Sequence, residues 1–148
     1  MLISFVFSFR NEESNLVELV RRVSDATKKI VDIDYEMIFV NDASTDSSLS
    51  LLLEMQKTFP ITIINMSRRF GVTPCVLAGF EYTKGDAVIY MDSDLQDPPE
   101  LIGELIEKFR QGAHVVHTTR TEREGEGFVK LLITKFAYRI INRFSEIR

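Results

Sequence analysis

Three carboxylates fall within six residues of one segment, which reads DAVIYMDSDLQDPPE. The segment begins with an apolar run, Ala87 to Met91, typical of a strand buried on both faces. Asp92 and Asp94 can reach one cation if the backbone turns after this strand, and Gln96 adds a neutral oxygen. Oxygen ligands of this kind suit Mg²⁺ or Mn²⁺, with positions left open for diphosphate oxygens. We therefore predict a metal site at the end of the strand.

Helix capping is the competing interpretation of the same acids. Asp97 stands before Pro98, and this order is favourable for the start of a helix. Capping accounts for one acid but not for three acids with Gln96 among them, so the pattern favours the metal site.

Apolar runs that alternate with segments of helical period predict the elements that must position these residues. Strands are expected at 3–9, 35–40, 61–66, 87–91 and 113–119. Single helices between them indicate right-handed crossovers and an α/β fold with a parallel sheet covered by helices on both faces. Polar residues that follow the strands should then meet at one edge of the sheet. Those expected to converge are Glu12, Asp42, Arg68, Asp92, Asp94 and Arg120.

Each of these polar clusters also has a purely structural interpretation. The run NDASTD after the second strand offers acceptors for a base or ribose, but alone it favours a turn, with Ser44 or Thr45 as a helix N-cap. Glu12 or Glu13 could instead be an acid in the first helical turn. Four arginines could bind phosphate, because the guanidinium group matches the geometry of phosphate oxygens. Taken alone, each is more often a charged side chain exposed to solvent. They are Arg68, Arg69, Arg120 and Arg123.

Composition limits the possible functions. The chain has 148 residues and a net charge of −4, which fits one folded domain and argues against general nucleic-acid binding. Cys75 is its only cysteine, so no internal disulfide can form and a reducing compartment is expected; the residue itself should lie in the core. No stretch approaches the roughly 20 apolar residues of a membrane span, so membrane contact by this chain would be peripheral.

The charge divides the chain into two parts. Residues 1–119 carry −7 and residues 120–148 carry +3. We expect a ligand-binding core over residues 1–120, followed at 121–148 by a charged loop and an amphipathic, basic helix. That helix would lie on a membrane surface, contact a second copy of the chain, or pack on the sheet.

Five motifs in order carry a family resemblance: RNEES, VNDASTD, SRRFG, AGFEYTKGD and DSDLQDPPE. Together they resemble the family 2 glycosyltransferases of GT-A (Rossmann-like) fold. The branch they resemble most is the polyprenyl-phosphate glycosyltransferases, which use dolichyl or undecaprenyl phosphate. A lone DxD motif is weak, but DSDLQDPPE is specific, and the resemblance covers nearly the whole chain.

This resemblance implies inverting transfer of a sugar from a UDP- or GDP-sugar to a polyprenyl phosphate at the cytoplasmic face of a membrane, for cell-envelope glycan or lipopolysaccharide modification. It implies that Asp92, Asp94 and Gln96 hold Mg²⁺ or Mn²⁺ and the diphosphate. It assigns Glu12 and Asp42 to the nucleoside. Arg120 and Arg123 would hold the diphosphate.

The chain departs from the family pattern at several points. Ala43 stands where Gly is common, which predicts an altered turn because Ala enters positive φ less readily. Arg69 stands where Asn is usual. Family members also continue with an acceptor-side segment, so the catalytic base is expected beyond residue 148. Two alternatives follow: a nucleotide-sugar-binding module without turnover, or another α/β phosphotransfer protein, which the DLQDPPE run disfavours.

Overall fold

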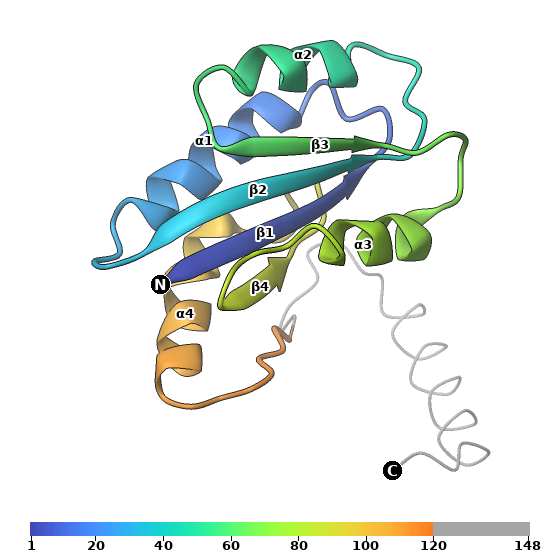
Figure 1. The fold of residues 1–148 in the computed structure, drawn as a ribbon. Coiled ribbons are helices and arrows are strands. Elements are labelled where there is room, and N and C mark those ends of the chain that lie inside the picture. The colour runs from blue at the N-terminus through green and yellow to red at the C-terminus, as the bar shows by residue number, and fades with distance from the viewer. Residues whose placement is uncertain (120–148) are drawn as a thin grey trace, which may run out of the picture. The chain divides into compact units, whose positions relative to one another are not determined.

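The computed structural model describes residues 1–119, in which strands and helices alternate along the chain (Figure 1). The elements are β1 (Leu2–Phe9), α1 (Leu16–Thr27), β2 (Asp34–Asn41), α2 (Ser48–Met55), β3 (Ile61–Asn65), α3 (Val72–Phe80), β4 (Ala87–Tyr90), the 3-10 helix η1 (Pro99–Leu101) and α4 (Ile102–Arg110). Met1–Val116 form one compact unit. The expected loop and helix at 121–148 lie outside the described residues.

The four strands form one parallel sheet in the order β3-β2-β1-β4. β1 pairs with β2 over its full length, from Leu2 opposite Asp34 to Phe9 opposite Asn41. β1 therefore lies inside the sheet, and the strands all end at the same edge. The parallel sheet expected from the alternation is confirmed.

Helices cover both faces of this sheet. Ile3, Phe5, Phe7 and Phe9 of β1 are buried on the face that carries α1, α2 and α4, where Phe7 stacks on a β2 phenylalanine with ring centroids 4.7 Å apart. On the opposite face the buried cluster includes Val6 of β1 and Cys75 of α3. Alternation along β1 therefore supplies two cores, and the expected core position of Cys75 is confirmed.

The helices that face the larger core carry stripes of apolar residues. In α1 the buried positions include Leu16, Leu19, Val20 and Val23, which recur at helical spacing. α1 has 12 residues and is the longest described helix. Within the described part of the chain, no helix combines the length and the apolar character needed to cross a bilayer.

α3 approaches β1 very closely. A Cβ built on Gly79 would lie 2.5 Å from Val6 Cγ1 and 3.2 Å from Val40 Cγ2. Glycine is thus required in α3 because the helix backbone packs directly on two β-branched side chains of the sheet.

The apolar run of the fourth strand is not buried on both faces, as its composition predicted. Among the described residues β4 pairs only with β1 and so forms an edge of the sheet, and Val88 and Tyr90 are 42% and 38% exposed. Their register with Ser4 and Val6 places both side chains on the α3 face of the sheet. An apolar run cannot distinguish an edge from a central position, because that depends on the strand order.

The expected fifth strand at 113–119 is also wrong. The structure assigns no strand there, and Val115 is 70% exposed. The amide of Ala113 donates to the carbonyl oxygen of Lys108 at 3.1 Å in the turn that ends α4, where Gly112 has φ +95°. A β-branched composition favours a strand only where a neighbouring strand is present to pair with it.

Candidate functional site

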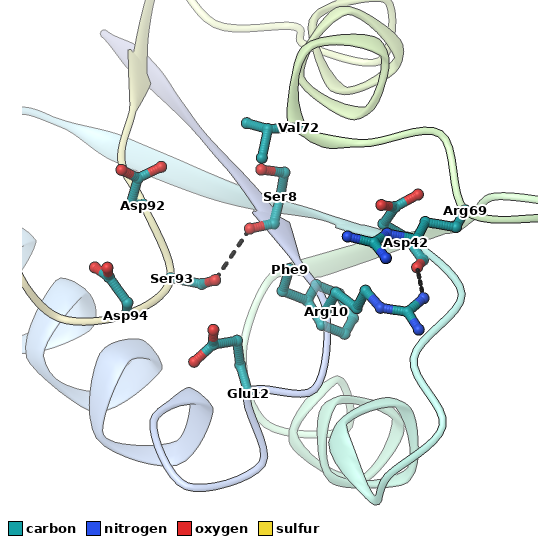
Figure 2. Close-up of a pocket in the computed structure, with 10 residues that line it drawn as sticks. All are labelled: Ser8, Phe9, Arg10, Glu12, Asp42, Arg69, Val72, Asp92, Ser93 and Asp94. Carbon is teal, nitrogen blue, oxygen red and sulfur yellow. Dashed lines mark hydrogen bonds between the residues drawn. The ribbon is translucent and has the colours of Figure 1, made fainter.

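A pocket of about 420 Å³ opens at the carboxyl edge of the sheet (Figure 2). Its walls come from the ends of β1 and β2 and from the loops that follow β3 and β4. The lining residues are Ser8, Phe9, Arg10, Glu12, Asp42, Arg69, Val72, Asp92, Ser93 and Asp94. Carboxyl ends of parallel strands are where open α/β sheets place their ligands.

The pocket brings together four of the predicted site residues: Glu12, Asp42, Asp92 and Asp94. In Figure 2, Asp92 and Asp94 lie on one side of the pocket and Asp42 on the other. Arg69, one of the four arginines considered for phosphate, also lines it, whereas Arg68 does not and lies over the ring of Phe70, 4.9 Å from the ring centroid. Gln96, two residues after Asp94, does not line the pocket, and Arg120 and Arg123 lie outside the described residues.

The backbone between the two aspartates is anchored to the end of β1. Ser93 is 5% exposed, and its hydroxyl donates to the carbonyl oxygen of Ser8 at 3.0 Å. Asp92 and Asp94 flank Ser93, and both line the pocket. The hydroxyl of the anchored Ser93 points toward β1, and the carboxylates on either side of it reach the same space.

Each aspartate has one oxygen engaged locally. Tyr90 donates its hydroxyl to Asp92 Oδ1 at 2.6 Å, and the amide of Gln96 donates to Asp94 Oδ1 at 3.0 Å. Burial, followed by the hydrogen bond to Asp92, raises the pKa of Tyr90 to about 12. The phenol is therefore protonated at neutral pH and acts as the donor.

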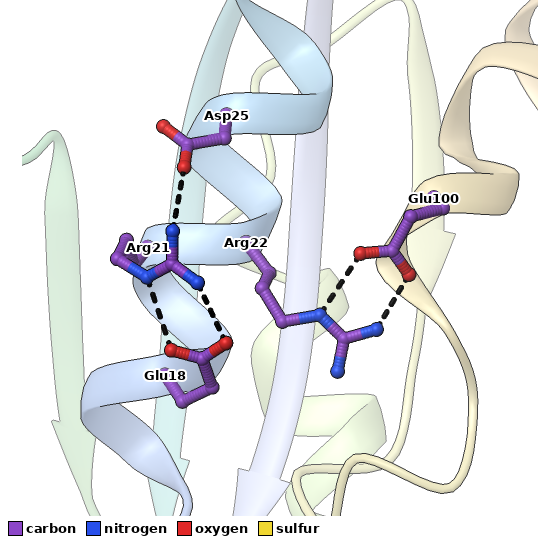
Figure 3. Close-up of polar contacts among 5 residues, drawn as sticks. All are labelled: Glu18, Arg21, Arg22, Asp25 and Glu100. Carbon is purple, nitrogen blue, oxygen red and sulfur yellow. Dashed lines mark hydrogen bonds and ion pairs between the residues drawn. The ribbon is translucent and has the colours of Figure 1, made fainter.

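The far end of the same segment is fixed to α1. Arg22 donates through Nε to Glu100 Oε1 at 2.9 Å and through Nη2 to the other oxygen (Figure 3). This hydrogen bond from Arg22 lowers the pKa of Glu100. Anchors at Ser93 and Glu100 thus hold the loop between β4 and α4 from both ends.

Asp42 is almost fully buried, at 6% exposure, and its carboxylate is bonded to the protein itself. Phe70 donates its amide to Oδ1 at 2.6 Å, and Gly71 donates to Oδ2 at 3.0 Å. Burial opposes ionisation of Asp42, but the hydrogen bonds from the two amides and from Cys75, with the nearby charge of Arg10, together outweigh it, so its pKa lies below the ordinary value. Burial and the adjacent Asp42 raise the pKa of Cys75 to about 11, so this thiol is not a nucleophile at neutral pH.

The loops that follow β1 and β2 are bonded to each other. Arg10 donates through Nη1 to the carbonyl oxygens of Asp42 and Ala43, at 3.0 and 2.9 Å. Thr45 donates its amide to Asn11 Oδ1 at 2.8 Å. Arg10 is thereby committed to the backbone, although it also lines the pocket.

The turn interpretation of NDASTD is confirmed. Ser44 donates its amide to Asn41 Oδ1 at 2.9 Å, as Asx side chains do in turns. The expected N-cap role of Ser44 or Thr45 is wrong, because α2 begins at Ser48, which donates its amide to Asp46 Oδ1 at 3.0 Å.

Three of the loops at this edge contain a residue other than glycine in the left-handed region. They are Asn11 (φ +56°), Ala43 (φ +54°) and Leu95 (φ +62°). Ala43 therefore adopts the conformation that its type disfavours, and Arg10 binds the carbonyl oxygens of the two peptide groups that flank the Ala43 Cα, those of Asp42 and Ala43. Strained backbone of this kind persists where surrounding bonds over-determine it.

Glu12 presents its carboxylate to the pocket from the loop before α1. Its Oε2 accepts a hydrogen bond from Asn15 Nδ2 at 2.7 Å, and its own amide donates to Ser48 Oγ at 2.8 Å. Asn15 is the N-cap of α1, so Glu12 and Glu13 both precede the helix. Neither is the first-turn acid that the alternative interpretation required.

Asp92 and Asp94 have the chemistry of an open cation site. Across residues 1–119, no three His, Cys, Asp or Glu side chains are grouped so that they could hold a metal alone. The two carboxylates each have Oδ2 without a partner among the described residues. Two carboxylate oxygens fit Mg²⁺ or Mn²⁺ if phosphate oxygens and water complete its coordination.

Arg69 supplies positive charge opposite these acids. It is an exposed pocket residue that makes no ion pair with any other described residue.

Sequence reasoning missed the anchoring residues Tyr90 and Ser93. The signal for Tyr90 was present, because residues two apart on a strand share a side. No local signal pointed to Arg10, whose acceptors lie more than 30 residues away.

The family model "Glycosyl transferase family 2" matches residues 4–148. Because the match spans nearly all of the sequence, the chain belongs to glycosyl transferase family 2. The expected family resemblance is confirmed.

Curated relatives agree with this assignment. The chain is 44% identical to an uncharacterized glycosyltransferase of Synechocystis over 99% of its length, and 34% identical to the bactoprenol glucosyl transferase of Shigella phage SfX over 98%. It is 40% identical over 82% of its length to an undecaprenyl-phosphate 4-deoxy-4-formamido-L-arabinose transferase of Pseudomonas fluorescens. It spans 46%, 48% and 36% of these relatives, about half their length or less.

Solved structures share the fold at low sequence identity. S. aureus TarS in complex with UDP-GlcNAc aligns with a TM-score of 0.57 and 17% identity, over 82% of this chain and 39% of that one. The mannosyltransferase PcManGT of Pyrobaculum calidifontis, in complex with GDP-Man and Mn²⁺, aligns with a TM-score of 0.54 and 19% identity, over 65% and 32%. The likeness confirms the expected GT-A fold.

Proposed function

We propose that the protein containing this chain transfers a sugar, with inversion, from a nucleoside-diphosphate donor to a polyprenyl phosphate. The observation that carries the proposal is the convergence of Glu12, Asp42, Asp92 and Asp94 on one pocket at the carboxyl edge of the sheet. Family membership supports the reaction class. The names of the bactoprenol and undecaprenyl-phosphate relatives support the lipid acceptor.

In this proposal Asp92 and Asp94 hold Mg²⁺ or Mn²⁺ at the diphosphate of a UDP- or GDP-sugar. Bound there, the cation would neutralise charge that develops on the departing nucleotide. The Mn²⁺ complex of PcManGT and the donor complexes of both solved structures support this choice of ligands. Gln96 remains a predicted ligand, and Arg120 and Arg123 remain predicted diphosphate contacts.

Asp42 and Glu12 would orient the nucleoside. Asp42 is bonded to the amides of Phe70 and Gly71, so its first effect is to fix the loop that carries Arg69. Glu12 keeps Oε1 available on the same side as Asp94. We propose that Glu12 contacts the ribose and that Asp42 acts on the base both directly and through the loop it holds.

The acceptor half of the reaction belongs to the longer protein. We propose that it acts at the cytoplasmic face of a membrane, where its lipid acceptor resides, and we assign no catalytic base to this chain. The main alternative is a module that binds nucleotide-sugar without turnover.

Product formation separates these two functions. The full-length protein is incubated with UDP- and GDP-sugars, Mn²⁺ and undecaprenyl phosphate, and glycosylated lipid is detected by mass spectrometry. Glycosylated lipid that is lost in Asp94→Asn supports the transferase. If the protein binds the donor in a cation-dependent way but neither transfers the sugar nor hydrolyses the donor, the binding module is favoured instead.

A further inference from the structure

Tyr90 is the last residue of β4 and makes one directed contact with the candidate cation site. Its hydroxyl donates to Asp92 Oδ1 at 2.6 Å, a short distance typical of a bond to a charged acceptor. The two residues stand two apart, so they lie on the same side of the extended chain. The tyrosine is 38% exposed, and the bond therefore lies at the rim of the molecule.

The backbone around Asp92 is already fixed by other bonds. The amide of Met91 donates to the carbonyl oxygen of Val6 at 3.2 Å, and the hydroxyl of Ser93 donates to the carbonyl oxygen of Ser8 at 3.0 Å. Both residues are nearly buried, at 6% and 5% exposure. These bonds fix the backbone on both sides of Asp92, but neither of them involves the Asp92 side chain, so they do not set its rotamer.

We propose that Tyr90 is a positioning residue of the cation site: it holds Asp92 through Oδ1 and reserves Oδ2 for a divalent cation. The inference rests on the proposed function, because it assumes that Asp92 is a cation ligand. Outer hydrogen bonds of this kind orient metal-binding carboxylates, and removing one typically costs 10–100-fold in metal affinity or activity.

Two other roles for the bond make different predictions. If the hydroxyl only stabilises the edge of the sheet, its loss would lower the melting temperature and leave cation affinity unchanged. If the hydroxyl competes with a cation for Asp92, its loss would tighten cation binding. A positioning role predicts weaker cation binding by a protein of nearly unchanged melting temperature.

The test uses Tyr90→Phe, which removes the hydroxyl and keeps the ring. Tyr82→Phe is the matched control, since Tyr82 is 56% exposed and its hydroxyl has no partner among the described residues. Calorimetry with UDP and with GDP, at a series of Mn²⁺ concentrations, gives the Mn²⁺ concentration for half-maximal nucleotide binding. Thermal melts without ligand are recorded in parallel.

We expect Tyr90→Phe to raise that Mn²⁺ concentration about 10–100-fold, while Tyr82→Phe matches the wild type. If the wild type binds nucleotide with Mn²⁺ and Tyr90→Phe has the same or a lower half-saturating concentration, the positioning role is overturned and the proposed function stands. If the wild type shows no Mn²⁺-dependent nucleotide binding, both are overturned.

Discussion

At the scale of single residues, Asp42 has the most demanding environment. Its two carboxylate oxygens accept the amides of Phe70 and Gly71, and Gly71 is the N-cap of α3. The position is favourable for an anion, because amides and the helix dipole both point toward it. A residue expected to contact a nucleoside therefore also determines how the neighbouring loop is held.

Replacing Asp42 with Asn should destabilise the protein by about 1–3 kcal/mol, because one of the two amides loses its acceptor. The pKa of Asp42 is lower in the folded protein than its ordinary value of 3.8, so its stabilising effect is complete above that value and is lost as pH falls through the folded pKa. Urea denaturation at several pH values measures both effects. A difference between wild type and variant that fails to shrink below about pH 4 would contradict this account.

Ala43 tests whether the left-handed turn is strained. The left-handed conformation destabilises the folded protein by about 1–2 kcal/mol when the residue is Ala. Gly removes this cost, but its greater freedom in the unfolded chain lowers the free energy of unfolding by about 0.4–1 kcal/mol relative to Ala. Ala43→Gly should therefore raise the free energy of unfolding by about 0.5 kcal/mol. The control is Ala26→Gly within α1, which should lower it by about 1 kcal/mol. Equal losses in the two variants would mean that φ at Ala43 is not +54°.

The sequence was informative about residues whose role is local. Alternating apolar and polar runs placed Asp92 and Asp94 at a strand end, and parallel topology placed Glu12 and Asp42 beside them. The bonds of Arg10 could not be predicted, because its partners are backbone carbonyl oxygens brought near only by the complete fold.

At the scale of elements, the contact of α3 with the sheet is the most constrained. Gly79→Ala should destabilise by about 1–3 kcal/mol, because its Cβ would lie 2.5 Å from Val6 Cγ1 and χ1 of a β-branched neighbour is restricted. Gly103→Ala in α4 is the control, since a Cβ there meets nothing within 4 Å and should stabilise by about 0.4–1 kcal/mol. Similar effects of the two changes on urea denaturation would refute the close approach.

The order of elements was predictable as far as α4, and the place of each strand within the sheet was not. β4 has the composition of an internal strand but lies at an edge of the sheet that residues 1–119 form, and 113–119 has the composition of a strand but no assigned pairing. Both errors have the same cause. Composition reports what a segment can do, whereas strand pairing depends on which neighbours the whole chain places beside it.

At the scale of the whole molecule, charge and length are the decisive features. Residues 1–119 carry −7, yet the proposed ligand is an anionic diphosphate. A divalent cation between Asp92 and Asp94 would resolve this conflict, because it converts an acidic wall of the pocket into one that attracts phosphate. The chain also spans about half the length of the curated relatives it matches.

The most direct test of the donor site is calorimetric titration of UDP and GDP into the protein, with Mn²⁺ and again with EDTA. Wild type should bind at least one of the two nucleotides with Mn²⁺ and at least 10-fold more weakly with EDTA. Asp94→Asn, which keeps the size of the side chain but removes its charge, should bind equally weakly in both conditions. Nucleotide binding that is the same with EDTA, or unchanged in Asp94→Asn, would contradict a cation site at Asp92 and Asp94.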